Sequence, residues 1–388
     1  MKPFPSFRPL IVVSAIALVS LLAGGAGALL GVCGPFTDVS DATFCPFVLE
    51  IFTLGITTGT TPTTFDPAGN VSRLQMAAFL SRTVDRTLQR RSPRAALDQF
   101  WTTQNATVLG LTTVGALPFL ARSDGTDVWV ANNGGNSVSR VRAGDGKLLE
   151  TWTGATGASG VLVAMGRVFA TNYTFPGNLY LIDPSQAAGV VSTVATNLTN
   201  FPAGIAFDGS RIWAAGAGVS IVTPGTTIPW TVTTVTAGFG GQTGALYDGA
   251  NIWVTDDGPG VLRKLDSTAA ILQTVTVGTF PYFPVFDGSN IWVPNQGSAS
   301  VTVVRASSGA VLATLTGNGL NSPHQAAFDG ERVLVTNSIG NSVSLWKAAD
   351  LTTIGTFSTG PGTQPWGACS DGKNFWITLQ FTSQLARF

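Results

Sequence analysis

The sequence predicts a mainly β protein, a seven-bladed β-propeller that follows a small N-terminal α-helical module. Three observations carry this prediction. A unit of about forty residues recurs seven times in the second part of the chain, and each copy reads as short strands and turns. Charged residues are only 11% of the chain, whereas 44% are hydrophobic and 46 are glycine, which favours tightly packed strands joined by short turns. Apolar residues at helical spacing occur after the leader only within residues 36–86.

The first 28 residues have the pattern of a secretion signal. Lys2 and Arg8 precede an uncharged apolar run from Leu10 to Val32, and Ala26-Gly27-Ala28 offers a cleavage site. The run is also long enough for an uncleaved membrane anchor. We expect cleavage, and no membrane span afterwards, because the Gly/Ala stretch at 23–28 forms helix poorly. The protein is therefore predicted to be secreted to the cell surface.

Export would place the cysteines in an oxidising compartment. Cys33 and Cys45 are predicted to pair, and a disulfide that closes so short a loop contributes about 2–3 kcal/mol. Lipid attachment at Cys33 is the alternative, although Val32 stands where such sites want Gly or Ala. Cys369 lies in an apolar strand, which predicts a buried small hydrophobe.

Residues 33–86 are predicted to form two short helices. "CPFVLEIFTLG" (45–55) has helical spacing and ends at Gly55, and a second helix begins at Ser72 with Gln75 three residues on, a capping box. With "FTDV" (36–39), "LGITTG" (54–59), "FDP" (65–67) and "VSRLQMAAFLSR" (71–82), the segment resembles one repeat of the S-layer homology (SLH) family.

The SLH resemblance implies contact with cell-envelope polysaccharide. In that family a Thr-Arg-Ala-Glu stretch opens the second helix, and its Arg contacts acidic polymer. Here the stretch is Ser72-Arg73-Leu74-Gln75, so the Arg is kept and the acid is lost. The expected polymer-binding residues are Ser72, Arg73, Gln75, Gly55 and Gly59. Alternatively, Ser72 and Gln75 only cap the helix, and the module has a structural role or docks a surface protein.

A linker at 87–105 leads into residues 106–388, where an Asp-Gly turn marks each repeat. The aligned glycines are 39 to 43 residues apart, and only the second unit replaces Asp-Gly, with "AMG". A large apolar residue follows most of these glycines by four positions, which we interpret as a wedge between blades. The glycines are Gly125, Gly166, Gly209, Gly249, Gly288, Gly330 and Gly372.

Each repeat contains four predicted strands except the last, which has three. The missing strand is expected at the start of the domain, where "ATVLGLTTVGALP" (106–118) matches "AVLATLTGNGLNSP" (310–323), so that it closes the ring. "VWVANN", "IWVTDD" and "IWVPNQ" resemble the Tyr-Val-Thr-Asn (YVTN) repeat of bacterial and archaeal surface proteins. That resemblance implies an exported seven-bladed propeller, seldom with a defined activity.

The residues favour binding over catalysis. Formal net charge is zero, which provides no basic field for nucleic acid. The chain has one histidine, His324, and neither Cys/His metal spacing nor a phosphate-cradling loop, so we expect no cofactor and no metal. Streptogramin lyases are similar in fold and blade pattern and use histidine, acidic residues and magnesium. The alternative is therefore a lyase-like or polysaccharide-acting enzyme in which His324 would be the base.

Two residue sets are predicted at the mouth of the central channel. Aromatic residues stand six positions before several of the repeat glycines and could stack on sugars or peptide, or plug the channel: Phe119, Tyr282, His324 and Trp366. Polar residues end the second strand of most units and could contact the same ligand, or only form turns: Asn132, Asn172, Asp256, Asn295 and Asn337.

Overall fold

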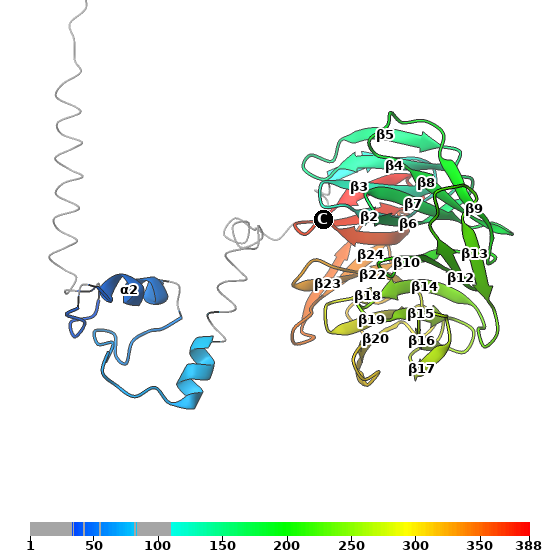
Figure 1. The fold of residues 1–388 in the computed structure, drawn as a ribbon. Coiled ribbons are helices and arrows are strands. Elements are labelled where there is room, and N and C mark those ends of the chain that lie inside the picture. Colours follow the sequence, from blue (N-terminus) through cyan, green and yellow to red (C-terminus); the bar gives the residue numbers. More distant parts are fainter. Residues whose placement is uncertain (1–32, 34, 42, 54–55, 81–82, 84–109) are drawn as a thin grey trace, which may run out of the picture. The chain divides into compact units, whose positions relative to one another are not determined.

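The computed structural model describes residues 33, 35–41, 43–53, 56–80, 83 and 110–388. The chain separates into two compact units, residues 1–102 and 103–388 (Figure 1). The predicted signal at 1–28, Gly55 and the linker at 87–105 lie outside the described residues, so the boundaries there remain predictions. None of the described helices is long and apolar enough to cross a membrane.

The first unit is a small module built around a disulfide. As predicted, Cys33 is bonded to Cys45, with 5.4 Å between their Cα atoms. Cys45 opens helix α2 (Cys45–Thr53), and a second helix includes residues 73–80. The buried ring of Phe36 packs against Phe52 at 5.1 Å and Phe65 at 5.6 Å between centroids. The module therefore has a core of its own, centred on Phe36.

The second unit consists of seven four-stranded antiparallel sheets, which confirms the predicted seven-bladed propeller. Blades 1 and 2 contain β2 (Pro118–Ser123), β3 (Asp127–Asn132), β4 (Ser137–Arg142), β5 (Leu148–Thr153), β6 (Ala158–Ala164), β7 (Arg167–Asn172), β8 (Gly177–Ile182) and β9 (Ser192–Leu198). Blades 3 and 4 contain β10 (Gly204–Phe207), β11 (Ile212–Gly216), β12 (Gly218–Thr223), β13 (Thr231–Val235), β14 (Gln242–Tyr247), β15 (Ile252–Asp256), β16 (Val261–Leu265) and β17 (Ile271–Thr276).

Blades 5 and 6 contain β18 (Val285–Phe286), β19 (Asn290–Asn295), β20 (Ser300–Arg305), β21 (Val311–Leu315), β22 (Pro323–Phe328), β23 (Arg332–Asn337), β24 (Ser342–Lys347) and β25 (Thr353–Ser358). Blade 7 contains β26 (Pro365–Ser370), β27 (Phe375–Leu379), β28 (Gln384–Arg387) and β1 (Gly110–Thr113). Figure 1 shows this order from the centre to the rim for β2 to β5 in blade 1 and for β14 to β17 in blade 4.

Blade 7 joins the two ends of the propeller in one sheet. Its strand order is β1-β28-β27-β26, and β1 pairs antiparallel with β28, with Gly110 opposite Arg387 and Thr113 opposite Gln384. The outermost strand of this blade therefore comes from the start of the domain. Such closure leaves no blade with an unpartnered face.

The repeated Asp-Gly turn holds the repeated tryptophan. In five blades the indole Nε1 donates to the Oδ2 atom of the turn aspartate at 2.7–2.9 Å, while the Oδ1 atom of the same aspartate accepts backbone N–H groups of its own turn. We call this arrangement the Asp–Trp clasp, formed by Asp124–Trp129, Asp208–Trp213, Asp248–Trp253, Asp287–Trp292 and Asp371–Trp376. In blade 6 Leu334 replaces the tryptophan, and Asp329 accepts from Arg332 Nε at 3.1 Å instead.

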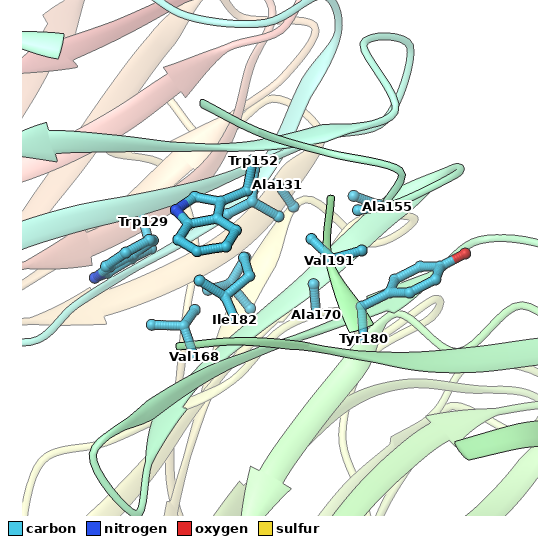
Figure 2. Close-up of a cluster of buried hydrophobic side chains, with 12 residues drawn as sticks. Trp129, Ala131, Trp152, Ala155, Val168, Ala170, Tyr180, Ile182 and Val191 are labelled. Carbon is cyan, nitrogen blue, oxygen red and sulfur yellow. The ribbon is translucent and has the colours of Figure 1, made fainter. Parts of the chain in front are cut away.

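Each wedge residue belongs to a core that two neighbouring blades share. Figure 2 shows the core between blades 1 and 2, where Trp129 and Trp152 meet Val168 and Ile182. Six similar clusters fill the other six interfaces, and each contains the tryptophan, leucine or phenylalanine at the repeat position. The periodic aromatic residues are therefore packing residues. They repeat because the blade interface repeats.

Candidate binding surface on the loop face

Two kinds of loop meet on one face of the propeller. Loops that lead into the first strand of a blade are hydrogen-bonded to loops that join the second and third strands. The N–H of Tyr173 donates to Gly157 O at 2.7 Å, that of Gln296 to Phe280 O at 2.9 Å, and that of Ser338 to Ser322 O at 3.0 Å. We call this surface the loop face. It comprises residues 114–117, 133–136, 154–157, 173–176, 199–203, 217, 236–241, 257–260, 277–284, 296–299, 316–322, 338–341, 359–364 and 380–383.

The loop face is almost free of charge. Across all its segments Asp257 is the one residue among Asp, Glu, Lys, Arg and His. The turns at the opposite ends of the strands, which we call the turn face, carry fourteen such residues: Asp124, Asp145, Lys147, Asp183, Asp208, Arg211, Asp248, Asp266, Asp287, Asp329, Glu331, Asp350, Asp371 and Lys373. The two faces of one propeller therefore differ sharply in the chemistry that they present to solvent.

A continuous row of rings runs around the mouth of the channel. The ring centroids are 5.2 Å apart for Phe201–Tyr173, 6.1 Å for Tyr173–Phe119, 5.1 Å for Phe119–Trp366, 3.7 Å for Trp366–His324 and 4.4 Å for His324–Tyr282. We call these six residues the aromatic arc. In this order they come from blades 3, 2, 1, 7, 6 and 5, or from the loops that lead into them.

The inner part of the arc crosses the axis of the propeller. Leu120, Ala203 and Phe283 form one buried cluster, and Phe119, Tyr282 and Trp366 pack against it. These residues belong to blades 1, 3, 5 and 7, and non-adjacent blades can meet only across the axis. The inner rings therefore plug the channel, which was one of the two alternatives that the sequence left open.

His324 lies at the buried centre of the arc. Its side chain is inaccessible to solvent, between the rings of Trp366 and Tyr282. Burial lowers the pKa of His324 to about 3, against a smaller opposing effect of the Trp366 backbone. The imidazole is therefore neutral at physiological pH and packs here as an aromatic ring.

The outer part of the arc is open to solvent. Tyr173 is 50% exposed and Phe201 is 46% exposed, and Phe280 in a neighbouring loop is 54% exposed. Phe201 and Phe280 have left-handed backbones, with φ of 55° and 51°, and each precedes a proline. A non-glycine residue in this region costs about 1–3 kcal/mol. The same conformation recurs before the prolines that follow Leu117, Ser322 and Gln364, so it belongs to the repeat and not to the exposed rings alone. These strained loops nevertheless present two large apolar rings to water.

The sequence did not single out Tyr173, Phe201 or Phe280. Phe201 and Phe280 both lie eight residues before their repeat glycines, and Tyr173 directly follows a second strand, but neither position is aromatic in most of the repeats. The sequence feature that could have identified them is an aromatic residue within a loop rich in Gly, Pro or Thr, as in "YTFP" (173–176) and "TNFPA" (199–203). Strand packing does not require an aromatic residue at such a position.

The polar residues at the ends of the second strands are internal braces. Asn132, Asn172, Asp256, Asn295 and Asn337 are all buried, so none presents its side chain to solvent. Asn295 shows the pattern: it accepts from Gly278 N at 3.0 Å and donates to Ser300 Oγ at 3.2 Å and Thr302 Oγ1 at 2.9 Å. Asp256 accepts from the backbone of Gly240 and Gly241 and from Arg263 Nε at 2.8 Å. These residues fix the loops that carry the arc, and we leave them out of the proposed surface.

Blade 4 contributes no ring to the aromatic arc, and Asp257 lies in a loop of that blade. The residue follows β15, and its half-buried carboxylate packs over Gly241, where an added Cβ would stand 2.4 Å from Oδ1. Burial and the neighbouring Asp256 raise the pKa of Asp257. Burial, the charge of Asp257 and Tyr173 raise the pKa of Tyr282. The loop of Asp257 lies against the loop that carries Tyr282, since Val277 N donates to Gly260 O at 3.1 Å.

In the first module, two of the expected polymer-binding residues form the predicted capping box. Ser72 N donates to Gln75 Oε1 at 2.8 Å, and Gln75 N donates to Ser72 Oγ at 3.2 Å. Arg73 lies beside them and is exposed. Gly59 is structural, because its φ is 80° and a Cβ there would lie 2.5 Å from the Phe36 ring. Gly55 lies outside the described residues. Of this set, Arg73 has the guanidinium free to reach a polymer.

No group of three or more His, Cys, Asp or Glu side chains suited to a metal ion occurs within the part of the chain that the structure describes. Cys369 is a free, buried thiol, and burial raises its pKa to about 12. The surface is thus built from rings, amides and hydroxyls, together with one carboxylate.

Comparison with known protein families gives a match for the first module. Residues 35–77 match the model of the S-layer homology domain, so the chain joins an SLH domain to a seven-bladed propeller. No curated protein sequence matches the chain.

Solved structures similar to the chain include a streptogramin B lyase (14% identity, TM-score 0.60, 74% of this chain and 99% of that one). Others are a virginiamycin B lyase from Staphylococcus aureus (16%, 0.60, 72% and 98%) and a hydrazine synthase of Kuenenia stuttgartiensis (15%, 0.59, 74% and 97%). At such identities the likeness shows the propeller fold alone.

Proposed function

We propose that the protein is an exported binding or scaffold protein of the cell surface, held by its SLH module while the propeller binds a ligand through the loop face. The SLH domain suggests attachment to cell-envelope polymer, and Arg73 is the residue that we expect to make that contact. The Cys33–Cys45 disulfide fits an oxidising compartment outside the cell. The resemblance of the blades to the YVTN repeat, a prediction from the sequence, fits the same location.

The observation that carries the propeller's role is the exposed aromatic arc on an uncharged face. A stable monomeric fold gains nothing from leaving Tyr173 and Phe201 half in water on strained or open loops. Aromatic rings that face solvent beside amide and hydroxyl groups suit ligands with alternating apolar and polar faces. We therefore assign ligand binding to the aromatic arc and anchoring to the SLH module.

The dependence of binding on salt concentration distinguishes the Arg73 contact from the contact of the aromatic arc. Binding of the purified full chain to isolated cell envelopes would be measured for wild type, Arg73→Ala and the double variant Tyr173→Ser/Phe201→Ser. Added salt should weaken the Arg73 contact, because exposed charges are screened over about 8–10 Å, and should leave stacking on the arc largely unchanged. The matched control is Leu272→Ser/Leu312→Ser, two exposed apolar residues on outer strands. If the arc variant binds like the control, the loop face is not the binding surface.

Catalysis on the same face is the alternative function. A lyase-like or polysaccharide-acting enzyme would need His324 as its base, and here that imidazole is buried and neutral. Turnover of streptogramins or acidic polysaccharides by the purified protein, abolished in His324→Ala, would replace our proposal.

A further inference from the structure

Asp257 has no cationic partner among the described residues, although its neighbour has one. Asp256 is paired with Arg263 at 2.8 Å, whereas no ion pair involves Asp257 within the described part of the propeller, and only the backbone of Gly258 and of Asp257 itself is given as hydrogen-bonding its carboxylate there. A half-buried carboxylate without a counter-charge is unfavourable, since the low dielectric weakens its solvation. The cost is removed when a ligand supplies the positive charge.

The rings near Asp257 are suited to the same positive charge. The loop of Asp257 is hydrogen-bonded to the loop that carries Tyr282, because Val277 N donates to Gly260 O at 3.1 Å, and the charge of Asp257 raises the pKa of Tyr282. An ammonium group over a tyrosine face is attracted by the negative face of the ring, and a carboxylate beside it adds to that attraction. The rest of the loop face carries no Asp, Glu, Lys, Arg or His, so a ligand with one ammonium group and an otherwise neutral body would match it.

The shape of the arc favours a chain of sugars as that body. The exposed rings of Phe201 and Tyr173 continue, at centroid separations of 5.2 and 6.1 Å, into the partly buried ring of Phe119, and Tyr282 is partly open at the other end of the arc. Sugar rings stack their apolar faces on aromatic side chains and turn their hydroxyls toward amides and hydroxyls. The loops supply such groups, for example Thr174, Asn200 and Thr279.

We infer that the loop face binds a glycan that contains an amino sugar, with the ammonium group beside Asp257 and the neighbouring sugars against the aromatic arc. This inference rests on the proposed binding role of the loop face and adds the ligand class. Asp257 acts as the specificity residue, because it distinguishes the free amine from its neutral, acetylated form.

The test compares two oligosaccharides that differ at one amine. Calorimetry on the full chain would measure the affinity for an N-acetylglucosamine tetramer with one residue deacetylated and for the fully acetylated tetramer, at a mildly acidic pH where the free amine is protonated. We expect the tetramer with the free amine to bind about tenfold more tightly. In Asp257→Asn, which keeps the side-chain shape, the two affinities should become equal, while the melting temperature is no lower than that of the wild type.

Equal affinities in the wild type, or a preference that survives Asp257→Asn, would overturn the inference. So would binding of a lysine-containing peptide, but of neither oligosaccharide, through Asp257. In each case the envelope assay with Tyr173→Ser/Phe201→Ser still decides the proposed function independently. Loss of envelope binding in that variant, together with equal oligosaccharide affinities, would keep the loop face as a binding surface and reject the amino sugar.

Discussion

The turn face and the loop face of the propeller come from the same seven repeats, yet only one of them is regular. On the turn face the Asp–Trp clasp recurs in five blades with nearly constant bond lengths. On the loop face the aromatic arc is irregular: four of its rings share one repeat position that is not aromatic in blades 2 to 4, and Phe201 and Tyr173 come from two other positions. Features that repeat build the fold, and features that break the repeat are where ligand recognition is to be sought. Four changes test this division, from the largest expected effect to the smallest.

Replacing a clasp tryptophan should strongly destabilise the propeller. Trp292 is fully buried between blades 5 and 6 and donates to Asp287 at 2.8 Å. Trp292→Ala should lower the free energy of unfolding by about 3–5 kcal/mol, because it leaves a cavity in a shared core. Denaturant unfolding followed by tryptophan fluorescence measures this, with Trp292→Phe as the milder control. A loss below about 1 kcal/mol would mean that the repeated tryptophan is not a packing residue.

The second largest effect depends on pH and comes from His324. Its pKa is about 3 in the folded protein and about 6.5 in an unfolded chain, so between these values the unfolded state binds the extra proton. Stability should therefore be complete above pH 6.5 and fall as the pH drops, by on the order of 3 kcal/mol at pH 4.

The matched variant for this prediction is His324→Phe, which keeps a ring and removes the only histidine of the chain. Its stability should depend less on pH than that of the wild type between pH 6.5 and 4, whatever its absolute value. If the stability of the two proteins depends on pH in the same way, the imidazole of His324 is accessible to solvent and not buried.

A smaller effect is expected at the clasp aspartates. Burial alone would raise the pKa of Asp208, but the bonds from Trp213, Arg211 and Ser210 together hold it at about 2. This stabilisation should be present above pH 4 and disappear as the pH falls toward 2. Asp208→Asn should cost about 1 kcal/mol at neutral pH and flatten the acid limb of the unfolding profile. If the loss of stability between pH 4 and pH 2 is the same in the variant and the wild type, other groups cause that loss.

The fold was predictable because packing forces it to repeat. The regular spacing of Gly125, Gly209 and Gly288 predicts the length of one blade. The consecutive apolar residues Ile291, Trp292 and Val293 predict a strand that is buried on both sides. Cys33 and Cys45 could likewise be paired from their short separation and the export signal.

The site was predictable only in part, because its members do not share one repeat position. Alignment found Phe119, Tyr282, His324 and Trp366, yet it could not tell that His324 would be buried while Tyr282 stays partly open. Tyr173 and Phe201 joined them through loop conformations that depend on hydrogen bonds between distant segments, such as Phe201 N to Thr174 O at 2.9 Å. The difference in charge between the loop face and the turn face could not be predicted either, because it becomes visible only when the strand order shows on which face each turn lies.

The smallest effect on stability should come from the outer arc. Tyr173→Ser and Phe201→Ser remove half-exposed rings from loops, and each should change the free energy of unfolding by no more than about 0.5 kcal/mol. Each should nevertheless weaken ligand binding by about 1–3 kcal/mol, by analogy with stacking on nucleic-acid bases. Thermal melts and envelope binding on the same samples separate the two quantities. A variant that loses stability and keeps its affinity would make the outer rings structural.

Footprinting of the full chain on isolated cell envelopes tests the division between the two faces most directly. Hydroxyl-radical labelling would report the exposure of Tyr173, Phe201 and Phe280 on the loop face, and of Met165 on the turn face, in the free and the bound protein. We predict that the three loop-face rings become protected on binding while Met165 remains labelled as before. Protection of Met165 with unchanged labelling of the aromatic residues would contradict a binding role for the loop face.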